Sequence, residues 1–262
     1  MPITVTVAQY EFIYNAFSFT LAAMAAATLF FWISRSQVSA NYKTALTISG
    51  LVTAIAAYHY FRIFNSWEAA YVVRNGTIAA TGYGFNDAYR YVDWLLTVPL
   101  LLIELILVMR LSSEETTSRA WRLGSAAALM IILGYPGEIA SDIPTRALWG
   151  TLSTIPFLYI VYSLFSGLGA SISRQPENVR GLIKDARLLT FGSWGFYPLV
   201  YMLPFIGMTG GAVTTGVQLG YTLADLISKV GLGILVYIIS VRKTANERSE
   251  SGVQGATMAH AE

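Results

Sequence analysis

The segment YRYVDWLLTVPLLLIEL, residues 89–105, has the composition of a membrane helix but carries Arg90, Asp93 and Glu104. A carboxylate at the centre of a bilayer costs about 2.5–3.5 kcal/mol. Asp93 and Glu104 are eleven residues apart, so they share a helix face with an axial separation of about 16 Å. This spacing predicts two stations on one proton route, with Asp93 near mid-membrane and Glu104 toward the cytoplasmic end. The alternative is that Glu104 extends to the membrane interface near Arg110.

The last apolar segment, VQLGYTLADLISKVGLGILVYIIS, carries Lys229 in its middle and Asp225 one helical turn earlier. Side chains four residues apart lie on the same helix face. One interpretation is a buried ion pair that fixes helix packing, although such a pair adds little stability over apolar residues. Ionisable residues inside a membrane are by default functional. A lysine in an apolar pocket beside carboxylates also has the chemistry for a Schiff base with a carbonyl cofactor.

Other polar and aromatic residues fit more than one interpretation. Thr97 lies one turn after Asp93, and Arg90 lies one turn before it, where a positive charge favours an ionised carboxylate. His59 in AAYHYFRIF fits either a satisfied core histidine or a proton site shared with Asp93. Aromatic residues crowd the remaining interior and fit either ordinary core and interfacial positions or a sandwich around a flat, apolar polyene. They are Trp94, Trp149, Trp194, Tyr197 and Tyr201, with Pro198 kinking its helix.

The composition identifies a membrane protein. Hydrophobic residues make up 55% of the 262 residues, charged residues only 12%, and the mean hydropathy is +0.53, whereas soluble domains have about 25% charged residues. The chain has no cysteine and two histidines, which excludes disulfides and thiolate metal sites, and we expect no metal site. The net charge of +2 gives no signal for nucleic acid, and we expect no nucleic-acid partner.

Apolar segments of about 20 residues, long enough to cross a bilayer, recur along the chain. They predict an all-α membrane protein, a bundle of seven transmembrane helices at roughly residues 10–34, 44–67, 87–109, 121–142, 146–168, 182–206 and 213–241. The connections are short, so residues 1–243 are expected to form a single domain. Residues 244–262 are polar and rich in Gly, Ser and Ala, and we expect a disordered cytoplasmic tail.

The loop between the second and third helices contains Asn75-Gly76 between β-prone runs, which predicts a short β-hairpin.

Basic residues predict the orientation of the bundle. Twelve Lys and Arg residues lie in the tail and in the loops after the first, third and fifth helices, against Arg62, Arg74, Arg90 and Arg146 on the other side. This bias predicts an outer N-terminus and a cytoplasmic C-terminus. The N-terminus lacks a basic n-region, so we expect no removable signal peptide.

Two of these segments match a known family in residue type, spacing and helix. With RYVDWLLTVPLLL in the third helix and YTLADLISK in the seventh, residues 8–243 resemble the microbial (type I) rhodopsins. The segments YHYFRIFNSW, FNDAYRYVDW, GYPGEI and STIPF are similar to the xanthorhodopsin and Gloeobacter rhodopsin branch of the proteorhodopsin-like pumps. The resemblance implies a light-driven outward proton pump in the plasma membrane, and not an enzyme.

The resemblance also implies roles for the charged residues. All-trans retinal would be bound to Lys229 as a protonated Schiff base, with Asp93 as the proton acceptor and counterion and Asp225 as the second counterion. Glu104 would be the proton donor on the cytoplasmic side. The combination of Asp93, Thr97 and Glu104 is the signature of outward proton pumps in this family.

Further roles follow from the same resemblance. His59 would be the partner of Asp93, and Arg90 the switchable positive charge on the exit side. Leu101 matches a position where leucine accompanies green absorption and glutamine blue absorption. The implied retinal pocket comprises Trp94, Thr97, Leu101, Met130, Gly134, Ser153, Phe157, Trp194, Tyr197, Pro198 and Tyr201.

Two other functions use the same chromophore, namely a photosensor that signals to a transducer and a light-gated channel. A sensor has less need of a proton donor such as Glu104, and the tail is too short for a signalling domain.

One departure from the haloarchaeal pumps concerns proton release. Those pumps have two glutamates near the outer ends of the sixth and seventh helices, where PFIGMTGGAVTTGVQLG has none. Glu138 and Asp142 are candidate substitutes, although a solvated helix end is the simpler interpretation.

Gly150, in RALWGTLSTIPF, stands where the haloarchaeal pumps have a tryptophan that covers the retinal ring. The missing side chain predicts a slot in the lipid-facing wall. The resemblance to xanthorhodopsin-like pumps implies a carotenoid antenna there, with a hydroxylated or keto-carotenoid as second cofactor. The alternative is ordinary small-residue packing between membrane helices. Membrane lipid, protons and further copies of the chain, as a homo-oligomer, are the expected partners.

Overall fold

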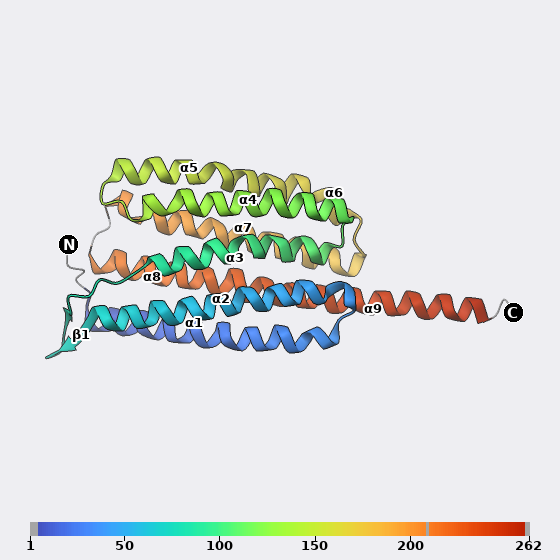
Figure 1. Cartoon of the computed structure of the whole chain (residues 1–262), viewed down its shortest axis with the longest axis horizontal. Coiled ribbons are helices and arrows are strands. Elements are labelled where there is room, and N and C mark those ends of the chain that lie inside the picture. The colour runs from blue at the N-terminus through green and yellow to red at the C-terminus, as the bar shows by residue number, and fades with distance from the viewer. Residues whose placement is uncertain (1–4, 208–209, 260–262) are drawn as a thin grey trace.

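The computed structural model describes residues 5–207 and 210–259. Its helices lie side by side along one axis and form a bundle (Figure 1). In chain order they are α1 Val7–Ser34, α2 Ala40–Ala70, α3 Ala88–Met109, α4 Ser113–Glu138, α5 Ile143–Tyr162, α6 Gly169–Ser173, α7 Glu177–Tyr201, α8 Gly211–Leu226 and α9 Leu232–Ala259. The π-helical turn Ser163–Gly167 leads from α5 to α6, and the π-helical turn Ile227–Gly231 joins α8 to α9. Each π-helical turn joins its two helices into one continuous rod, α5 with α6 and α8 with α9. Over the described residues the helices therefore form seven rods, as predicted.

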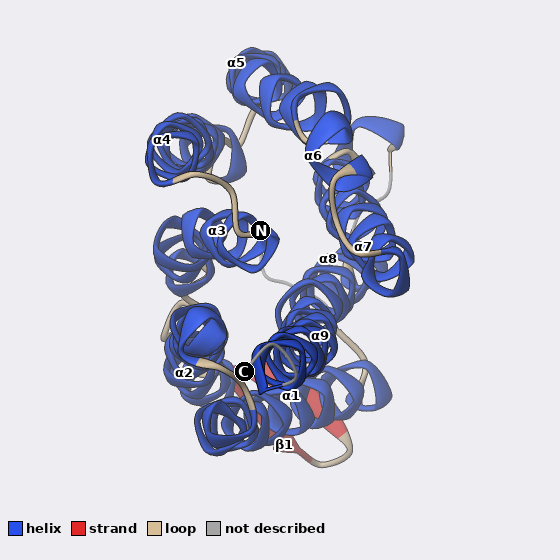
Figure 2. Ribbon diagram, turned by 90° about the vertical axis from the view of Figure 1, so that its right-hand side faces the viewer, coloured by secondary structure: helices blue, strands red, loops and turns tan. Residues whose placement is uncertain are grey.

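The two ends of the bundle differ. The hairpin end is the end at which β1 lies, and the tail end is the end from which α9 projects (Figure 1). Consecutive helices from α1 to α5 pack against one another, and α8 and α9 return to contact α1, α2 and α7. Seen end-on, α3 faces α7 and α8 across the interior (Figure 2). α8 therefore lies opposite α3 across the interior of the bundle (Figure 2).

Polar residues set several helix ends beyond the apolar segments. At the start of α1, Thr6 N donates to Gln9 Oε1 at 2.9 Å and Gln9 N donates to Thr6 Oγ1 at 3.2 Å, a reciprocal capping box. At the start of α4, Glu115 N donates to Ser112 Oγ at 3.2 Å. α3 ends where Arg110 adopts the left-handed conformation, with φ of 56°. Because these caps lie in polar sequence, α4 begins eight residues before its predicted apolar span at residue 121.

The predicted β-hairpin is confirmed. Strand β1, Tyr71–Arg74, pairs antiparallel with β2, Thr77–Ala80. The two residues between the strands, Asn75 and Gly76, have φ of 51° and 74°. A two-residue hairpin turn with positive φ at both positions favours Asn-Gly, because these residues tolerate that conformation. Tyr71 packs on Trp67 of α2, with ring centroids 4.6 Å apart, and so fixes the hairpin to the bundle.

The distribution of apolar residues is that of a bundle in lipid. Within the described residues, five helical stretches are long and apolar enough to cross a membrane: Val7–Gln37, Ala40–Ala70, Ala88–Met109, Ile143–Ser173 and Gly211–Ser251. α4 and α7 have comparable lengths of 26 and 25 residues, but charged residues occupy their first turns. Large apolar side chains face outward, such as Phe19 at 64% and Ile155 at 63% exposure, while Asp93, Glu104 and Lys229 lie inside.

The helix α9 continues past residue 243, where the sequence predicts the start of a disordered tail. The structure is helical through Ala259. Glu247 Oε1 accepts hydrogen bonds from Tyr42 OH at 2.7 Å and Asn41 Nδ2 at 3.1 Å, and Thr244 Oγ1 accepts one from Ser39 N at 2.9 Å. The first turn of the tail is thus ordered, because its polar side chains have partners at the start of α2. The domain boundary at residue 243 stays a prediction.

Candidate functional site

A buried amine lies between two carboxylates in the middle of the bundle. Lys229 Nζ donates to Asp225 Oδ1 at 2.8 Å and to Asp93 Oδ2, and all three side chains are at most 1% exposed. Asp93 comes from α3, Asp225 from the end of α8, and Lys229 from the π-helical turn Ile227–Gly231. The structure therefore brings together three of the charged residues that the sequence singled out. A lysine this deeply buried requires such partners, because an unpaired charge there is very costly.

The two carboxylates have different surroundings. Asp225 Oδ1 also accepts hydrogen bonds from Trp94 Nε1 at 2.9 Å and Tyr197 OH at 2.7 Å, and Asp225 Oδ2 accepts one from Tyr60 OH at 2.8 Å. Asp93 Oδ1 is buried without a hydrogen-bond partner. Hydrogen bonds to a carboxylate favour its ionised form. The anion is therefore stabilised more strongly at Asp225, and Asp93 is the better placed of the two to take up a proton.

Two further predicted residues lie close to Asp93. His59 Nδ1 is 3.8 Å from Asp93 Oδ1, within ion-pair distance but too far for a direct hydrogen bond, and lies 2.9 Å from the carbonyl oxygen of Ile55. Thr97 Oγ1 donates to the backbone oxygen of Asp93 at 2.8 Å rather than to its carboxylate. Thr97 therefore braces the α3 backbone at this point, while His59 is the nearer candidate for electrostatic interaction with Asp93.

Arg90 occupies the hairpin side of the cluster. Its side chain is 1% exposed, and Nη1 donates to Tyr60 OH at 3.1 Å and lies 3.7 Å from Asp225 Oδ2. Nη2 donates to Gln218 Oε1 at 2.8 Å. The guanidinium also lies 5.6 Å from the centre of the Tyr221 ring, close enough for a cation–π interaction. Arg90 thus balances the excess negative charge of two carboxylates around one lysine.

Glu104 lies three turns further along α3, toward the tail end. It is 0% exposed, its Oε2 accepts a hydrogen bond from Ser49 Oγ at 2.7 Å, and its Oε1 has no partner. The alternative that Glu104 extends to the interface is therefore wrong, because the carboxyl group is enclosed between α2 and α3. Ser49 was missed from the sequence, since a lone serine on another helix gives no spacing signal.

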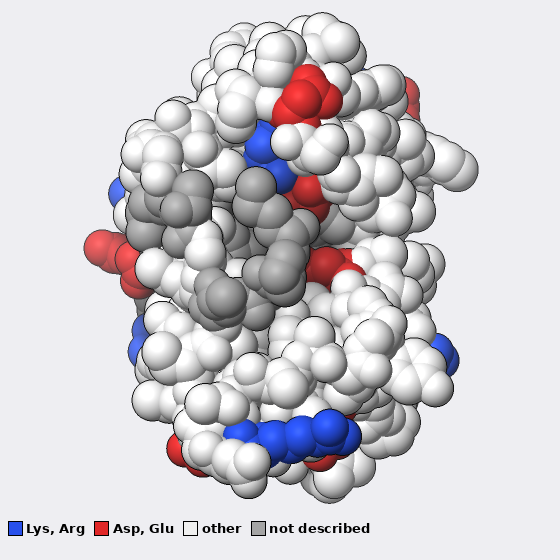
Figure 3. Space-filling view, turned by 90° about the vertical axis from the view of Figure 1, so that its left-hand side faces the viewer, with Lys and Arg blue, Asp and Glu red and all other residues white. Residues whose placement is uncertain are grey.

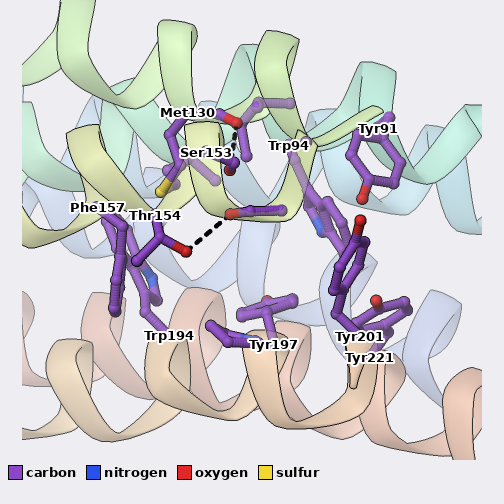
Figure 4. A pocket seen from close by; sticks show the side chains of 15 residues that line it. Tyr91, Trp94, Met130, Ser153, Thr154, Phe157, Trp194, Tyr197, Tyr201 and Tyr221 are labelled. Carbon is purple, nitrogen blue, oxygen red and sulfur yellow. Dashed lines mark hydrogen bonds between the residues drawn. The ribbon is translucent and has the colours of Figure 1, made fainter. Parts of the chain in front are cut away.

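A cavity that is partly open to the outside lies beside this cluster between α3, α4, α5 and α7 (Figure 4). The predicted residues Trp94, Met130, Gly134, Gly150, Ser153, Phe157, Trp194, Tyr197, Pro198 and Tyr201 line it. Tyr91, Val98, Ile131, Thr154 and Tyr221 also line it and were not predicted. Spacing along α3 gives a signal for Tyr91 and Val98, which lie three residues before and four after Trp94. Leu101 and Thr97 are buried but are not among the lining residues.

The cavity wall at Gly150 is closed in part by a tyrosine. A Cβ atom on Gly150 would lie 2.8 Å from Cε1 of Tyr201, so the ring packs directly against this glycine. Tyr201 OH donates to the backbone oxygen of Arg146 at 2.7 Å, which holds the ring in place. The exposed residue Thr154, one turn after Gly150, also lines the cavity. The cavity therefore reaches the outer face of α5 beside the ring.

The two candidate release residues at the end of α4 differ in exposure. Glu138 is only 12% exposed, its Oε2 lies 3.0 Å from Arg146 Nη2, and it accepts a hydrogen bond from Tyr221 OH at 3.4 Å. The interpretation of Glu138 as a solvated helix end is therefore wrong, because Arg146 covers it. Asp142 is exposed and caps α5, accepting a hydrogen bond from Thr145 N at 2.8 Å, which holds the pKa of Asp142 below its usual range.

The sequence matches a known family over most of its length. A family model described as "Bacteriorhodopsin-like protein" matches residues 12–242. The green-light absorbing proteorhodopsin of Gamma-proteobacterium EBAC31A08 is 31% identical over 238 residues, 89% of each chain. The bacteriorhodopsin of Halobacterium salinarum is 32% identical over 220 residues, 82% of this chain and 79% of that one. The chain belongs to the bacteriorhodopsin-like family, that is, to the microbial (type I) rhodopsins, as the sequence predicted.

Solved structures agree with this assignment. Xanthorhodopsin, described as a light-driven ion pump with dual chromophore, superposes with a TM-score of 0.89 at 51% identity, covering 93% of this chain and 98% of that one. A thermophilic rhodopsin superposes with a TM-score of 0.91 at 44% identity, covering 94% and 99%. The family is one of multi-pass membrane proteins of the cell membrane, and the seven-helix fold is shared along almost the whole chain.

Proposed function

We propose that the chain is a light-driven outward proton pump that carries retinal on Lys229. The observation that supports this most is the placement of carboxyl groups on both sides of one buried amine. Asp93 and Asp225 contact Lys229 Nζ from the hairpin side, while Glu104 lies enclosed toward the tail end. A proton on that nitrogen therefore has an acceptor on one side and a donor on the other.

The residues around the cavity fit retinal. Their side chains are mainly aromatic or aliphatic, as is usual in pockets for small apolar ligands. Trp94 and Tyr197 line the cavity and also donate hydrogen bonds to Asp225, so the cavity adjoins the lysine cluster. Retinal, when bound to the amine through its aldehyde, supplies light absorption and a change of shape that reorients the nitrogen.

The residues of the chain would set the direction of transport. Asp93 accepts the proton from the Lys229 nitrogen, because its carboxylate has fewer donors than that of Asp225. Asp225 stays ionised and keeps Arg90 close to the cluster. Glu104 then gives its proton to the nitrogen and is refilled from the tail side. In each cycle a proton leaves toward the hairpin end and another enters from the tail end.

The orientation of the bundle in the membrane determines on which side of the cell the protons are released. Basic residues are concentrated at the tail end of the bundle, which by the positive-inside rule lies in the cytoplasm. The hairpin end, with few basic residues, then faces outward, so the proposed transport acidifies the outside of the cell. The N-terminus lies outside and the C-terminus inside in this arrangement.

A vectorial assay tests the proposal. Cells or vesicles that contain the retinal-loaded chain are illuminated while the external pH is followed, with and without a protonophore. We expect acidification outside cells that the protonophore abolishes. A coloured protein that responds to light without moving protons would instead support the photosensor, and a passive conductance that follows the imposed gradient would support the channel.

A carotenoid antenna is the second cofactor that we propose. Gly150 and the exposed Thr154 both line the cavity, so an extended apolar polyene on the outer face of α5 would lie next to the retinal site. The 51% identity to xanthorhodopsin, which is described as having a dual chromophore, supports the same interpretation. Close approach of two polyenes permits energy transfer between them.

The test of the antenna uses added hydroxylated or keto-carotenoids and purified protein. We expect a structured absorption shift, induced circular dichroism and carotenoid bands in the excitation spectrum. Gly150→Trp should abolish all three while proton pumping by retinal continues, because the new side chain displaces the Tyr201 ring and covers the outer face of α5 at this position. Absence of all three signals in the wild type with several such carotenoids would assign Gly150 to packing. The predicted homo-oligomer stays a proposal, to be tested by the mass of the detergent-solubilised protein.

A further inference from the structure

Arg90 lies between two carboxylates at different depths. Its Nη1 is 3.7 Å from Oδ2 of Asp225, which is 0% exposed, and its Nε is 3.4 Å from Oδ1 of Asp87, whose side chain is 32% exposed. Asp87 is the residue immediately before α3, at the hairpin end. One guanidinium therefore contacts both the deepest acid of the lysine cluster and an acid that reaches the surface.

Polar groups connect these two acids without interruption. Tyr60 OH donates to Asp225 Oδ2 at 2.8 Å and accepts from Arg90 Nη1 at 3.1 Å. On the other side of the guanidinium, Gln218 Oε1 accepts from Arg90 Nη2 at 2.8 Å, and Gln218 Nε2 donates to Asp87 Oδ2 at 3.2 Å. The series starts at the lysine cluster and ends at a carboxylate that water can reach.

The other acids at the hairpin end have different partners. Charged side chains of both signs lie close together near the middle of this face (Figure 3). Glu138 of α4 is neutralised by Arg146, and Asp142 is bonded to the start of α5. Neither has a hydrogen bond or ion pair with Arg90, and Arg90 acts on Glu138 only through a longer-range electrostatic interaction. Asp87 interacts electrostatically with Glu138 and with the hydroxyls of Tyr91 and Tyr221, and among the described residues Arg90 is the cation in ion-pair contact with it.

We infer that Asp87 is the exit carboxylate of the outward proton route, the last protein group to hold the proton before it enters the outside water. This inference rests on the proposed pumping function and supplies the release group that the glutamate-free outer ends of the sixth and seventh helices leave open. The step is a proton transfer alone. An O–H bond breaks on Asp93, one forms on Asp87, and that bond then breaks as water takes the proton.

The position of Arg90 gives this transfer its timing. When the Lys229 nitrogen gives its proton to Asp93, both groups become neutral, so the net charge of the cluster is unchanged and Asp225 is its one remaining anion, with Arg90 as the cation in contact with it. A shift of the Arg90 guanidinium toward Asp225 and away from Asp87 then lets Asp87 accept the proton. When the nitrogen is protonated again, Arg90 returns outward and the proton leaves Asp87 for water.

The test compares substitutions in the full retinal-loaded chain. A pH-sensitive dye in the outer medium times proton release after a flash, while absorbance follows the Lys229-to-Asp93 transfer. Asp87→Asn keeps the size of the side chain but cannot hold the proton, and we expect release to slow about tenfold or more with an unchanged early transfer. Asp87 makes no side-chain cap bond to α3, so the fold should persist, as the absorption band checks.

Controls separate a proton-carrying role from a structural one. Asp87→Glu should restore release to within about twofold of the wild type, and a small permeant buffer should speed release in Asp87→Asn, as expected for a missing proton carrier. Asp142→Asn should leave the release time unchanged. Parental release kinetics in Asp87→Asn would overturn the inference, as would a delay in Glu138→Gln alone. A wild type that releases no proton after the flash would instead refute the pumping function itself.

Discussion

The bundle is built differently on the two sides of Lys229. On the hairpin side, hydrogen bonds and ion pairs run from Asp225 through Arg90 to Asp87 at the surface. On the tail side, Glu104 bonds Ser49, and its second oxygen is buried without a partner. Protons can redistribute through a polar network by small side-chain movements, whereas a carboxyl group in apolar surroundings exchanges only after the helices move apart. In the proposed pump, we therefore expect the tail side to contain the barrier that makes transport one-way.

The tail-side barrier includes what we call the carbonyl clamp, formed by Lys243 and Gln175 on the last carbonyls of α3. Lys243 Nζ, in a side chain only 5% exposed, donates to Val108 O at 2.9 Å and Met109 O at 3.3 Å. Gln175 Nε2 donates to Met109 O at 3.0 Å. These donors satisfy carbonyls that a helix end leaves free. They also tie α3 to α9 and to the segment before α7. In the proposed pump, we expect proton access to Glu104 from this end to require the clamp to loosen.

Removing the amine at the centre should have the largest effect. Lys229→Ala is expected to abolish the visible absorption band, because the aldehyde of retinal has no amine to react with in the cavity. The other lysines are exposed or, like Lys243, bonded at the tail end. The measurement is an absorption spectrum before and after hydroxylamine. A coloured, hydroxylamine-sensitive band in the variant would refute Lys229 as the attachment site.

Substitution of the proton acceptor on the hairpin side should have the second-largest effect. Asp93→Asn removes a negative charge beside the Lys229 nitrogen and the acceptor for its proton, so we expect a red shift of the band and loss of pumping. Light-induced pH changes in vesicles and the absorption spectrum check both expectations. Asp225 should not substitute, because the ring donors around it stabilise its anion. Undiminished pumping by Asp93→Asn would rule out Asp93 as the acceptor.

Substitution of the proton donor on the tail side should have a smaller effect, confined to the rate of reprotonation. Glu104→Gln keeps the hydrogen bond with Ser49 possible but cannot donate a carboxylic proton, so reprotonation of the nitrogen should slow by about 100-fold, while the band stays nearly unchanged. Flash photolysis measures this rate, and azide, a small weak acid, should restore it. Late photocycle steps at the parental rate would make Glu104 a bystander.

The clamp should give the smallest effect, with the opposite sign. Lys243→Met removes hydrogen bonds worth about 1 kcal/mol each and is expected to speed reprotonation through Glu104 by about threefold to tenfold, because the tail side opens more easily. Lys243→Arg retains the donors and should behave like the wild type. Arg242→Met, which alters an exposed neighbour that bonds Asn178 O, is the matched control. An unchanged rate in Lys243→Met would limit the clamp to a structural role.

The sequence predicts features that depend on order along one helix. Asn75-Gly76 gave the hairpin, the apolar runs gave the rods, and four-residue spacing gave the ion pair of Asp225 with Lys229. Contacts between different helices could not be predicted in this way. The hydrogen bond of Ser49 to Glu104 depends on the rotation of one helix against another, which no local pattern specifies.

The same limit applies at both ends of the bundle. Gln218 and Asp87 are 131 residues apart yet share a hydrogen bond at 3.2 Å, and Lys243 binds carbonyls 134 and 135 residues away. Isolated polar residues near helix ends resemble solvated ones in a sequence, so their burial becomes visible only in the fold. Helix ends were also misjudged, because caps extend helices into polar sequence where hydropathy carries no signal.

The π-helical turn Ile227–Gly231 has a consequence for insertions and deletions during evolution. A π turn contains one more residue than an α turn. Lys229 therefore lies at the equivalent of a single-residue insertion in the helix formed by α8 and α9. Deleting one residue just after Lys229 would let the turn close as regular α-helix, and the helix beyond it would keep its orientation, because the π turn already accommodates that extra residue. Deleting one residue from the regular α-helix between this turn and Lys243 would instead rotate Lys243 by about 100°, away from the carbonyls of α3. A change of one residue in length should therefore be tolerated at the π turn far better than elsewhere in this helix.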